Sequence, residues 1–286
     1  MSDSSRALPH AFHVGHVRAL EHIRRMPGGS QPQLMRCSDG GYYVVKFRNN
    51  PQGRRVLVNE LLGTLLAARM GLPTAPAATV EVTDPLIRLT PDLSIELRDG
   101  RPPCAAGLHF GSRYLGTPKD SASSMCIWPH GSVENSPDFV GMLLFDKWTC
   151  NTDGRQVVFV RKQERFYRYK AYMIDNGFCF GGEAWKFADA PRRSLYRNAR
   201  VYEEITGFDS FEPWISRLEH EFNLELLREA AACIPACWLA GDEAEFSQLL
   251  QRLNRRRQKI RDELLLMRAA SPELFSRWER WCAATA

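Results

Sequence analysis

The apolar positions of this chain change their period about two fifths of the way along. In the first 116 residues, apolar side chains mostly alternate over short runs, which is the period-two pattern of β-strands. One stretch differs, at residues 55–70, where Leu57, Leu61, Leu65 and Ala68 recur at helical steps. Beyond residue 136, apolar faces with a period of 3.6 dominate. The pattern predicts an α+β protein with a sheet-rich first part and a mainly helical second part.

Individual elements are delimited by glycine, proline and small polar residues. Residues 17–26 suit a helix or a strand, and Ser38-Asp39-Gly40-Gly41 has the composition of a hairpin turn. Residues 117–135, rich in Ser, Pro and Gly, suit a loop or the connection between two lobes. The predicted strands are 33–37, 42–47, 157–161 and 169–174, with a small antiparallel sheet over 77–114. The predicted helices are 55–70, 137–149, 211–222, 224–232, 244–267 and 272–281.

Length and composition fit this division. A chain of 286 residues exceeds one typical domain and suits two lobes around a cleft, which we place at 1–116 and 117–286. Hydrophobic residues make up 44% of the chain, enough for a substantial core. No apolar run approaches the roughly 20 residues that a membrane helix needs, and no signal peptide is visible. We therefore expect a cytoplasmic protein without a membrane partner.

Charge and cysteine usage narrow the classes of function. The net charge of +5 suits anionic ligands but is too small to indicate nucleic acid by itself. Eight cysteines are scattered without a C-x-x-C pair, which favours reduced thiols over a disulfide framework or a zinc site.

Two features of the first part suggest phosphate binding. Gly28-Gly29-Ser30-Gln31 precedes a strand, and adjacent glycines let backbone N–H groups approach phosphate oxygens, although such a pair also makes ordinary turns. Lys46 lies in an apolar strand, and Glu60 follows fourteen residues later on a predicted helix. A buried lysine needs a counter-charge, and a strand lysine held by a helix glutamate is how kinases bind nucleotide phosphates. The alternative is an edge-strand lysine that points to water.

Two carboxylates in the second part suggest the other half of a site. Asp153 lies in the loop of residues 151–156, and Asp175 follows the next strand pair. Across a cleft, one carboxylate could orient or deprotonate a hydroxyl while the other holds Mg²⁺. The alternative is that Asp153-Gly154 forms a hairpin turn and Asp175 caps a turn, which are common roles of aspartate.

In this order, the segments resemble the HipA-like kinases. The first-part segments are Gly28-Gly29-Ser30-Gln31-Pro32, Val44-Val45-Lys46-Phe47, Val58-Asn59-Glu60-Leu61-Leu62 and Gly71-Leu72-Pro73. The second-part segments are Phe145-Asp146-Lys147-Trp148-Thr149-Cys150-Asn151-Thr152-Asp153 and Met173-Ile174-Asp175-Asn176-Gly177. The resemblance runs from about residue 17 to 260, and is closest to the compact form without the toxin's additional N-terminal subdomain.

The resemblance implies a two-lobed protein kinase-like fold, similar also to phosphoinositide kinases, that binds ATP and Mg²⁺. Its small antiparallel-sheet N-lobe would hold the nucleotide, and its C-lobe would be mainly helical. Lys46, held by Glu60, would bind the phosphates, and the strand 108–114 would run into the hinge that contacts adenine. The residues that would cover the phosphates are Gly28, Gly29, Ser30 and Gln31.

The resemblance also implies that Asp153 is the catalytic aspartate and Asp175 the metal-binding aspartate. The family usually has an asparagine, a second metal ligand, five residues after the catalytic aspartate, and here that position is Val158. Gln156 could supply an amide oxygen instead, one metal could suffice, or activity could be impaired.

A rival alignment assigns the catalytic role to Asp146, because Asp146 and Asn151 themselves have the five-residue spacing. We prefer Asp153, since Asp146 falls inside a predicted helix whereas Asp153 lies in the loop beyond it.

The leading hypothesis is an ATP- and Mg²⁺-dependent kinase acting on Ser or Thr hydroxyls of a protein or of itself. A non-catalytic nucleotide-binding pseudokinase is the alternative, motivated by Val158. The same fold would also allow a lipid kinase, while the arginines at residues 255–257 suggest a nucleic-acid partner that we regard as unlikely, because basic and aromatic residues are not interleaved. The family also includes toxins paired with a DNA-binding antitoxin, a partner that this sequence does not show.

Overall fold

The computed structural model describes residues 12–116, 132–163, 168–188, 190–196 and 198–278, with the side chains of 162 and 163 left out. Its first part is a closed five-stranded barrel with the order β1-β2-β3-β5-β4. The strands are β1 (Gly15–Arg25), β2 (Gln33–Cys37), β3 (Tyr42–Lys46), β4 (Ala77–Val82) and β5 (Gly107–Arg113).

The barrel is more than the antiparallel sheet expected from the pattern. Four of its pairings are antiparallel, but β1 pairs with β4 in parallel and thereby closes the barrel. The segment 17–26, ambiguous in sequence, is strand up to Arg25 and forms most of the long strand β1. Closure removes the exposed sheet edges, so the alternating apolar residues fill the barrel interior.

The segment between β4 and β5 was predicted as further strands, and this was wrong. It holds a short helix, α2 (Asp84–Arg88), followed by turns and isolated bridges. Pro85 suits the first turn of a helix, and the prolines at 91, 102 and 103 remove donors that a sheet ladder needs. Leu93 and Ile95 are nevertheless buried against the barrel core. The alternation of apolar and polar residues in this segment therefore reflects side-chain burial and not strand pairing.

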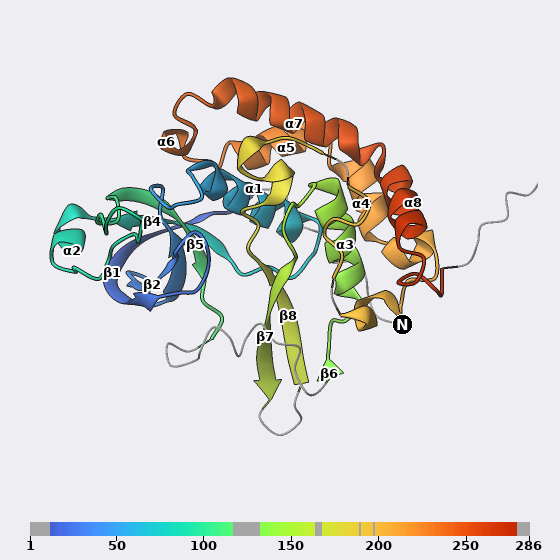
Figure 1. The fold of residues 1–286 in the computed structure, drawn as a ribbon, viewed down its shortest axis with the longest axis horizontal. Helices are drawn as coiled ribbons and strands as arrows, with labels where there is room; N and C mark the ends of the chain where they lie inside the picture. Colours follow the sequence, from blue (N-terminus) through green and yellow to red (C-terminus); the bar gives the residue numbers. More distant parts are fainter. Residues whose placement is uncertain (1–11, 117–131, 164–167, 189, 197, 279–286) are drawn as a thin grey trace, which may run out of the picture.

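Helix α1 (Arg55–Arg69) connects the barrel to the rest of the molecule. Every residue from Val56 to Ala67 is buried, which is far more than one apolar face. Figure 1 shows the helix between the barrel and the helices of the second part, and its apolar residues belong to the core of that second part. A helix buried all round is held on several sides, and α1 is therefore a fixed central element.

A small three-stranded sheet with the order β6-β8-β7 and the helix α3 form the middle of the chain (Figure 1). Their bounds are β6 (Ser132–Val133), α3 (Asp138–Trp148), β7 (Gln156–Gln163) and β8 (Arg168–Ile174). α3 is buried from Phe139 to Trp148, and its chain then turns sharply at Cys150, where φ is 50°. The loop from Asn151 to Arg155 leads directly into β7, as the sequence predicted.

The remaining chain is largely helical, with two differences from the prediction. The single helix expected at 244–267 is two helices, broken at Gln258 and Lys259, and residues 272–278 form turns instead of a helix. The elements are η2 (Cys179–Ala184), η3 (Ala199–Tyr202), η4 (Phe208–Phe211), α4 (Trp214–Glu221), α5 (Leu224–Ala231), α6 (Ala236–Leu239), α7 (Glu243–Arg257) and α8 (Ile260–Ala270). In the part of the chain that the structure describes, no helix has the length and apolarity needed to cross a membrane.

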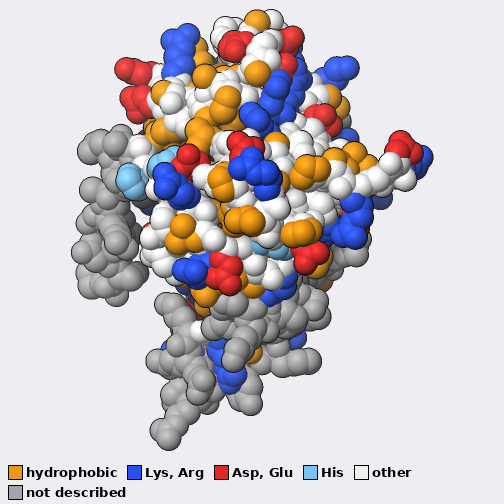
Figure 2. All heavy atoms as spheres, turned by 90° about the vertical axis from the view of Figure 1, so that its left-hand side faces the viewer, with side chains coloured by type: hydrophobic (Ala, Val, Ile, Leu, Met, Phe, Trp, Pro, Cys, Tyr) orange, Lys and Arg blue, Asp and Glu red, His pale blue; other side chains and the backbone are white. Residues whose placement is uncertain are grey.

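The barrel end of the molecule carries charges of both signs side by side (Figure 2). Arg18 pairs with Glu81, and Arg36 with Glu21, with N–O distances of 3.0 and 2.8 Å. Such exposed pairs add little stability.

Candidate active site

A cavity of about 260 Å³ lies between the barrel and the β7–β8 hairpin. Its walls are mostly apolar and its polar groups are few, which is typical of a small-molecule site. The barrel side is lined by Met26, Pro27, Pro32, Val44, Lys46, Phe110 and Ser112. The other walls are Glu60, Ala75, Arg113, Tyr114, Leu115, Gln156, Val158, Ile174 and Asp175. Arg113, the last residue of β5, and residues 114 and 115 after it thus contribute to the wall where the sequence predicted a hinge.

Lys46, at the end of β3, meets two carboxylates at this cavity. Its ammonium donates to Glu60 Oε1 of α1 and to Asp175 Oδ1, the latter at 2.8 Å. The side chains of Lys46 and Glu60 are 10% and 2% exposed, whereas that of Asp175 is 28% exposed. The structure therefore brings together three of the predicted site residues, one of them 129 positions from Lys46 in sequence.

This cluster contains one cation and two carboxylates, so it is not neutral when both carboxylates are ionised. Burial would lower the pKa of Lys46, but Glu60 and Asp175 raise it above its ordinary value. Burial raises the pKa of Glu60, and Lys46 only partly opposes this effect. Burial acts in the same direction on Asp175, but Lys46 holds the pKa of that carboxyl below its usual value. Asp175 is thus the group of this cluster whose ionised form is favoured at the cavity wall, and when Glu60 is ionised as well the cluster carries one negative charge in excess.

The backbone at Asp175 adopts a conformation that side-chain-bearing residues seldom take, with φ at 60°. The next residue anchors it: Asn176 N donates to Glu60 Oε2, and Asn176 Nδ2 donates to Thr64 Oγ1, both at 3.0 Å. Gly63 allows this approach, since a Cβ there would lie 2.8 Å from that of Asn176. Helix α1 and the Asp175 loop are therefore locked together.

Gln156, the first residue of β7, donates from Nε2 to Asp175 Oδ2 at 2.8 Å. Val158 lies on the same face of the strand, because residues two apart point the same way, and both line the cavity. The amide thus stands at the start of β7, two residues before the position expected for the family's asparagine. A carboxylate and a side-chain amide are hard oxygen ligands of the kind that Mg²⁺ prefers, so this donor set fits the ion.

Asp153 is exposed in the loop before β7, and it does not line the cavity. Its Oδ1 accepts a hydrogen bond from Gly154 N at 2.7 Å, and its own N–H donates to Asn151 Oδ1 at 3.2 Å. Asp153 is thus oriented by its loop and open to a second molecule. Its catalytic role stays a prediction.

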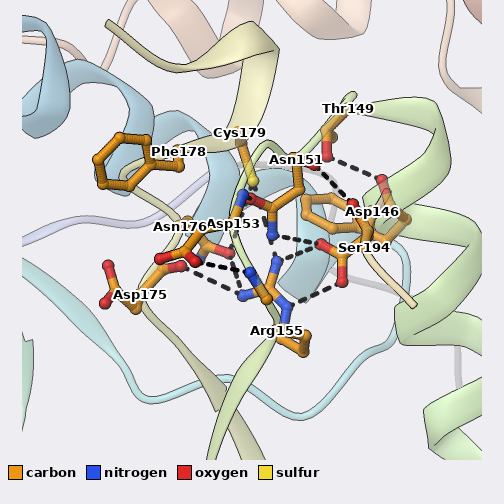
Figure 3. Close-up of polar contacts among 12 residues, drawn as sticks. Asp146, Thr149, Asn151, Asp153, Arg155, Asp175, Asn176, Phe178, Cys179 and Ser194 are labelled. Carbon is orange, nitrogen blue, oxygen red and sulfur yellow. Dashed lines mark hydrogen bonds and ion pairs between the residues drawn. The ribbon is translucent and has the colours of Figure 1, made fainter. Parts of the chain in front are cut away.

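Asp146, the residue of the rival alignment, is enclosed. Both its oxygens are bound by Arg155, and Oδ1 also accepts from Asn151 Nδ2 at 2.9 Å (Figure 3). The side chains of Asp146 and Arg155 have no exposed surface. A carboxylate held in this way cannot reach a substrate hydroxyl, and the geometry therefore disfavours Asp146 as the catalytic base.

The glycine-containing turn lies beside the cavity, but its four predicted residues do not line it. The cavity instead meets Met26, Pro27 and Pro32, on either side of the turn. Gln31 exchanges two hydrogen bonds of 2.7 Å with the backbone of Glu96, and Ser30 is buried. Gly28, with φ at 136°, needs to be glycine for its backbone conformation, and Gly29 packs against the end of the Gln52 side chain. Their contact with phosphates stays a prediction.

Two of the three arginines at 255–257 have a structural role. Arg256 donates to the carbonyls of Lys147 and Trp148 at 3.0 Å each, at the end of α3. Arg257 donates to the carbonyl of Glu219 at the end of α4. Both guanidinium groups thus satisfy helix C-termini, where carbonyls lack partners.

Sequence reasoning assigned no role to Arg155, Asn59 or Thr64. Asn59 Nδ2 donates to the carbonyls of Gly177 and Gly182, at 2.8 and 3.2 Å, and thereby ties α1 to the chain beyond Asp175. For Asn59 and Thr64 the sequence did contain a signal, because both are polar residues within the otherwise apolar segment of α1. A buried polar side chain needs a hydrogen-bond partner, so such residues indicate a contact with another segment.

These features define the class of the molecule: its fold is that of the kinase-like phosphotransferases. A structure similar to this chain is the proinflammatory kinase CtkA of Helicobacter pylori, with a TM-score of 0.54, 12% identity, and coverage of 92% of this chain and 100% of that one. The Golgi casein kinase is also found, with a TM-score of 0.45, 12% identity, and coverage of 91% and 75%. No curated protein matches the sequence.

The family follows from the sequence itself. A family model described as HipA-like kinase matches residues 20–271. The chain therefore belongs to the HipA-like kinases, and the resemblance deduced from its motifs is confirmed.

Proposed function

We propose that this kinase uses ATP and Mg²⁺ to phosphorylate a Ser or Thr hydroxyl of a protein, its own chain included. The observation that carries the proposal is the cluster of Lys46, Glu60 and Asp175, which opens onto the cavity with an excess of negative charge. A bound triphosphate would offer Lys46 a new anionic partner in place of Asp175. A divalent cation would then neutralise the charge of the Asp175 carboxylate.

In this proposal each residue has a positioning or electrostatic role. The apolar walls around Val44 and Phe110 hold the base, and Lys46 binds the phosphates. Asp175 and Gln156 would hold Mg²⁺, which neutralises charge on the transferred phosphoryl group. Asp153 accepts the proton of the acceptor hydroxyl. The bond from the γ-phosphorus to its bridging oxygen breaks as the acceptor oxygen bonds to phosphorus.

Phosphate transfer from ATP labelled at the γ-position tests the proposal. Incorporation into the chain or a generic protein substrate should require Mg²⁺, and should fall at least about 100-fold in Asp153→Asn and Asp175→Asn. Asp92→Asn, an exposed aspartate on the barrel side, is the matched control and should retain activity. Undiminished incorporation in both site variants would remove the assignment.

A non-catalytic nucleotide-binding module is the second candidate. It is favoured by Val158, an apolar side chain that lines the cavity at the position of the family's asparagine. This function predicts that ATP raises the melting temperature equally with and without Mg²⁺, while no phosphate is transferred. Val158→Asn places a side-chain amide at this position. Phosphate transfer by this variant would show that the unaltered protein lacks only a metal ligand, whereas no transfer would show that it lacks the catalytic activity itself.

A further inference from the structure

The Arg155 side chain is buried between helix α3 and the Asp175 loop, although it does not line the cavity. Its Nε and Nη2 bind the two carboxylate oxygens of Asp146, the Nε contact at 3.1 Å. This is the two-point geometry that a planar guanidinium offers to a carboxylate. Asp146 belongs to the fully buried part of α3, so this side of Arg155 is fixed to a rigid element.

The remaining terminal nitrogen of Arg155 reaches the Asp175 loop. Nη1 donates to the carbonyl of Ile174 at 2.8 Å and to Asn176 Oδ1 at 2.9 Å, and it lies 3.5 Å from the carbonyl of Asp175. These contacts surround Asp175 on both sides. Figure 3 shows Arg155 between Asp146 on one side and Asp175 with Asn176 on the other.

Asp175 needs such support because its φ of 60° is unfavourable for a residue with a side chain. In this conformation its carboxylate meets both Lys46 and Gln156. Relaxation of the backbone toward negative φ would turn the carboxylate away from both partners.

The same cluster also places the other predicted carboxylate. Asn151 donates to Asp146 and accepts the backbone N–H of Asp153 through its Oδ1. Asp146 therefore contributes to the position of both carboxylates. Arg155 connects it to the Asp175 loop, and Asn151 connects it to Asp153.

We propose that Arg155 is a positioning residue that fixes the Asp175 loop against α3 and so sets the geometry in which this kinase binds its metal. The proposal rests on the function proposed above. It requires a guanidinium, because the single nitrogen of a lysine cannot bind Asp146 at two points and also reach Ile174 and Asn176.

The test uses Arg155→Lys in the full chain, which keeps the positive charge beside Asp146 but loses the contacts around Asp175. Binding of Mn²⁺ with saturating ADP, followed by electron paramagnetic resonance, should weaken at least tenfold. Affinity for a fluorescent ADP analogue in EDTA should stay within twofold. Arg257→Lys, which alters an arginine–carbonyl contact away from the site, is the matched control and should bind Mn²⁺ normally.

Turnover gives a second measurement that a loss of stability alone would not produce. In Arg155→Lys, kcat should fall while the KM for ATP changes little, and raising Mg²⁺ well above its usual concentration should recover much of the rate. A rate that excess metal does not recover, in a variant that unfolds cooperatively, would contradict the proposal.

Should Arg155→Lys fail to fold, the paired variant Asp146→Leu with Arg155→Met takes its place. Apolar side chains of similar volume commonly replace a buried ion pair without loss of the fold. The same weakening of Mn²⁺ binding is expected.

The outcomes separate this proposal from the proposed function. If the unaltered protein binds no Mn²⁺ with ADP, the proposed function fails and this inference fails with it. If the unaltered protein and Arg155→Lys bind Mn²⁺ equally, the positioning role alone is overturned.

Discussion

Two groups of buried charge lie on either side of the Asp175 loop, and they differ in access and in charge balance. The closed cluster pairs Asp146 with Arg155, one carboxylate to one guanidinium, with no exposed surface on either side chain. The open cluster pairs Lys46 with Glu60 and Asp175, and it faces the cavity. Burial and ion pairing alone therefore do not identify a site.

The difference shows what makes one cluster able to bind. The closed cluster satisfies its own charges and has no capacity for a ligand. The open cluster has a carboxylate in excess and an accessible wall, so a phosphate and a cation can complete it. Asn176 joins the two, because it receives Arg155 Nη1 on its side chain and donates its backbone N–H to Glu60.

His109 shows what burial does to a charge that has no partner. Its ring lies wholly inside the barrel, 4.4 Å from the ring of Phe47, and its Nε2 has no hydrogen-bond partner among the described residues. Burial lowers the pKa of His109 to about 3, so the ring stays neutral. Lys46 and Arg155 are also buried, but they remain charged because each forms ion pairs with carboxylates.

The largest expected effect is on the stability of the closed cluster. Asp146→Ala leaves the Arg155 guanidinium buried without a counter-charge, and should cost about 3–5 kcal/mol of unfolding free energy. Asp175→Ala in the open cluster should cost no more than about 1 kcal/mol, because Lys46 retains Glu60. Urea unfolding of both variants measures the contrast, and equal losses would erase the distinction between the clusters.

The next effect is the acid sensitivity that His109 imposes. Its pKa is about 3 in the folded protein and about 6.5 when unfolded, so only the unfolded chain takes up its proton between these values. Stability should therefore fall as the pH drops through this window, by up to about 1.4 kcal/mol per pH unit. His109→Gln should flatten this slope in urea titrations, whereas the exposed control His220→Gln should retain it.

A smaller effect is expected where α1 contacts the Asp175 loop. Gly63→Ala places a methyl group 2.8 Å from the Cβ of Asn176, which Thr64, Glu60 and Arg155 hold in place. Overpacking of this kind should cost about 1–3 kcal/mol, although alanine normally favours a helix.

Gly207→Ala is the matched control for this variant, because nothing lies within 4 Å of the added group. Thermal unfolding compares the two, and a stabilised Gly63→Ala would show that the loop is free to move.

The smallest effect concerns the inner partner of Lys46. Glu60→Gln keeps the shape of the side chain but removes its charge, so Lys46 is held less firmly and kcat/KM for ATP should fall about tenfold. Steady-state kinetics of phosphate transfer measure the change. Unchanged kinetics would mean that Asp175 alone orients the ammonium.

Glu60 should also leave a signature in the pH dependence of stability. The pKa of Glu60 is raised in the folded protein. Its contribution to the free energy of unfolding is therefore full below the ordinary pKa of 4.5, and is lost as the pH rises through the pKa of the folded protein. Glu60→Gln should lack this loss. The stability difference between the variant and the unaltered protein should therefore shift in favour of the variant as the pH rises.

The local elements were largely predictable because they depend on nearby residues. The strands of the first hairpin, helix α1 and helix α3 were predicted within two residues of their observed ends. Between β4 and β5 the prediction was wrong because apolar residues alternate and are buried without forming strand hydrogen bonds. At Gln258 it was wrong because the apolar periodicity continues across the break between α7 and α8.

The sequence by itself determined the division into a sheet-rich and a helical part, the family, and the residues that could carry chemistry. Lys46 in an apolar strand already required a counter-charge. Only the tertiary structure decided which carboxylates supply it, that Asp146 is enclosed by Arg155, and that Gln156 rather than the residue at 158 reaches Asp175. The reason is physical: periodicity records the burial of each residue, whereas ion pairing depends on how separate elements pack against each other. Lys46 and Asp175 are 129 positions apart, and even Asp146 and Arg155, nine positions apart, meet only because the chain turns between α3 and β7.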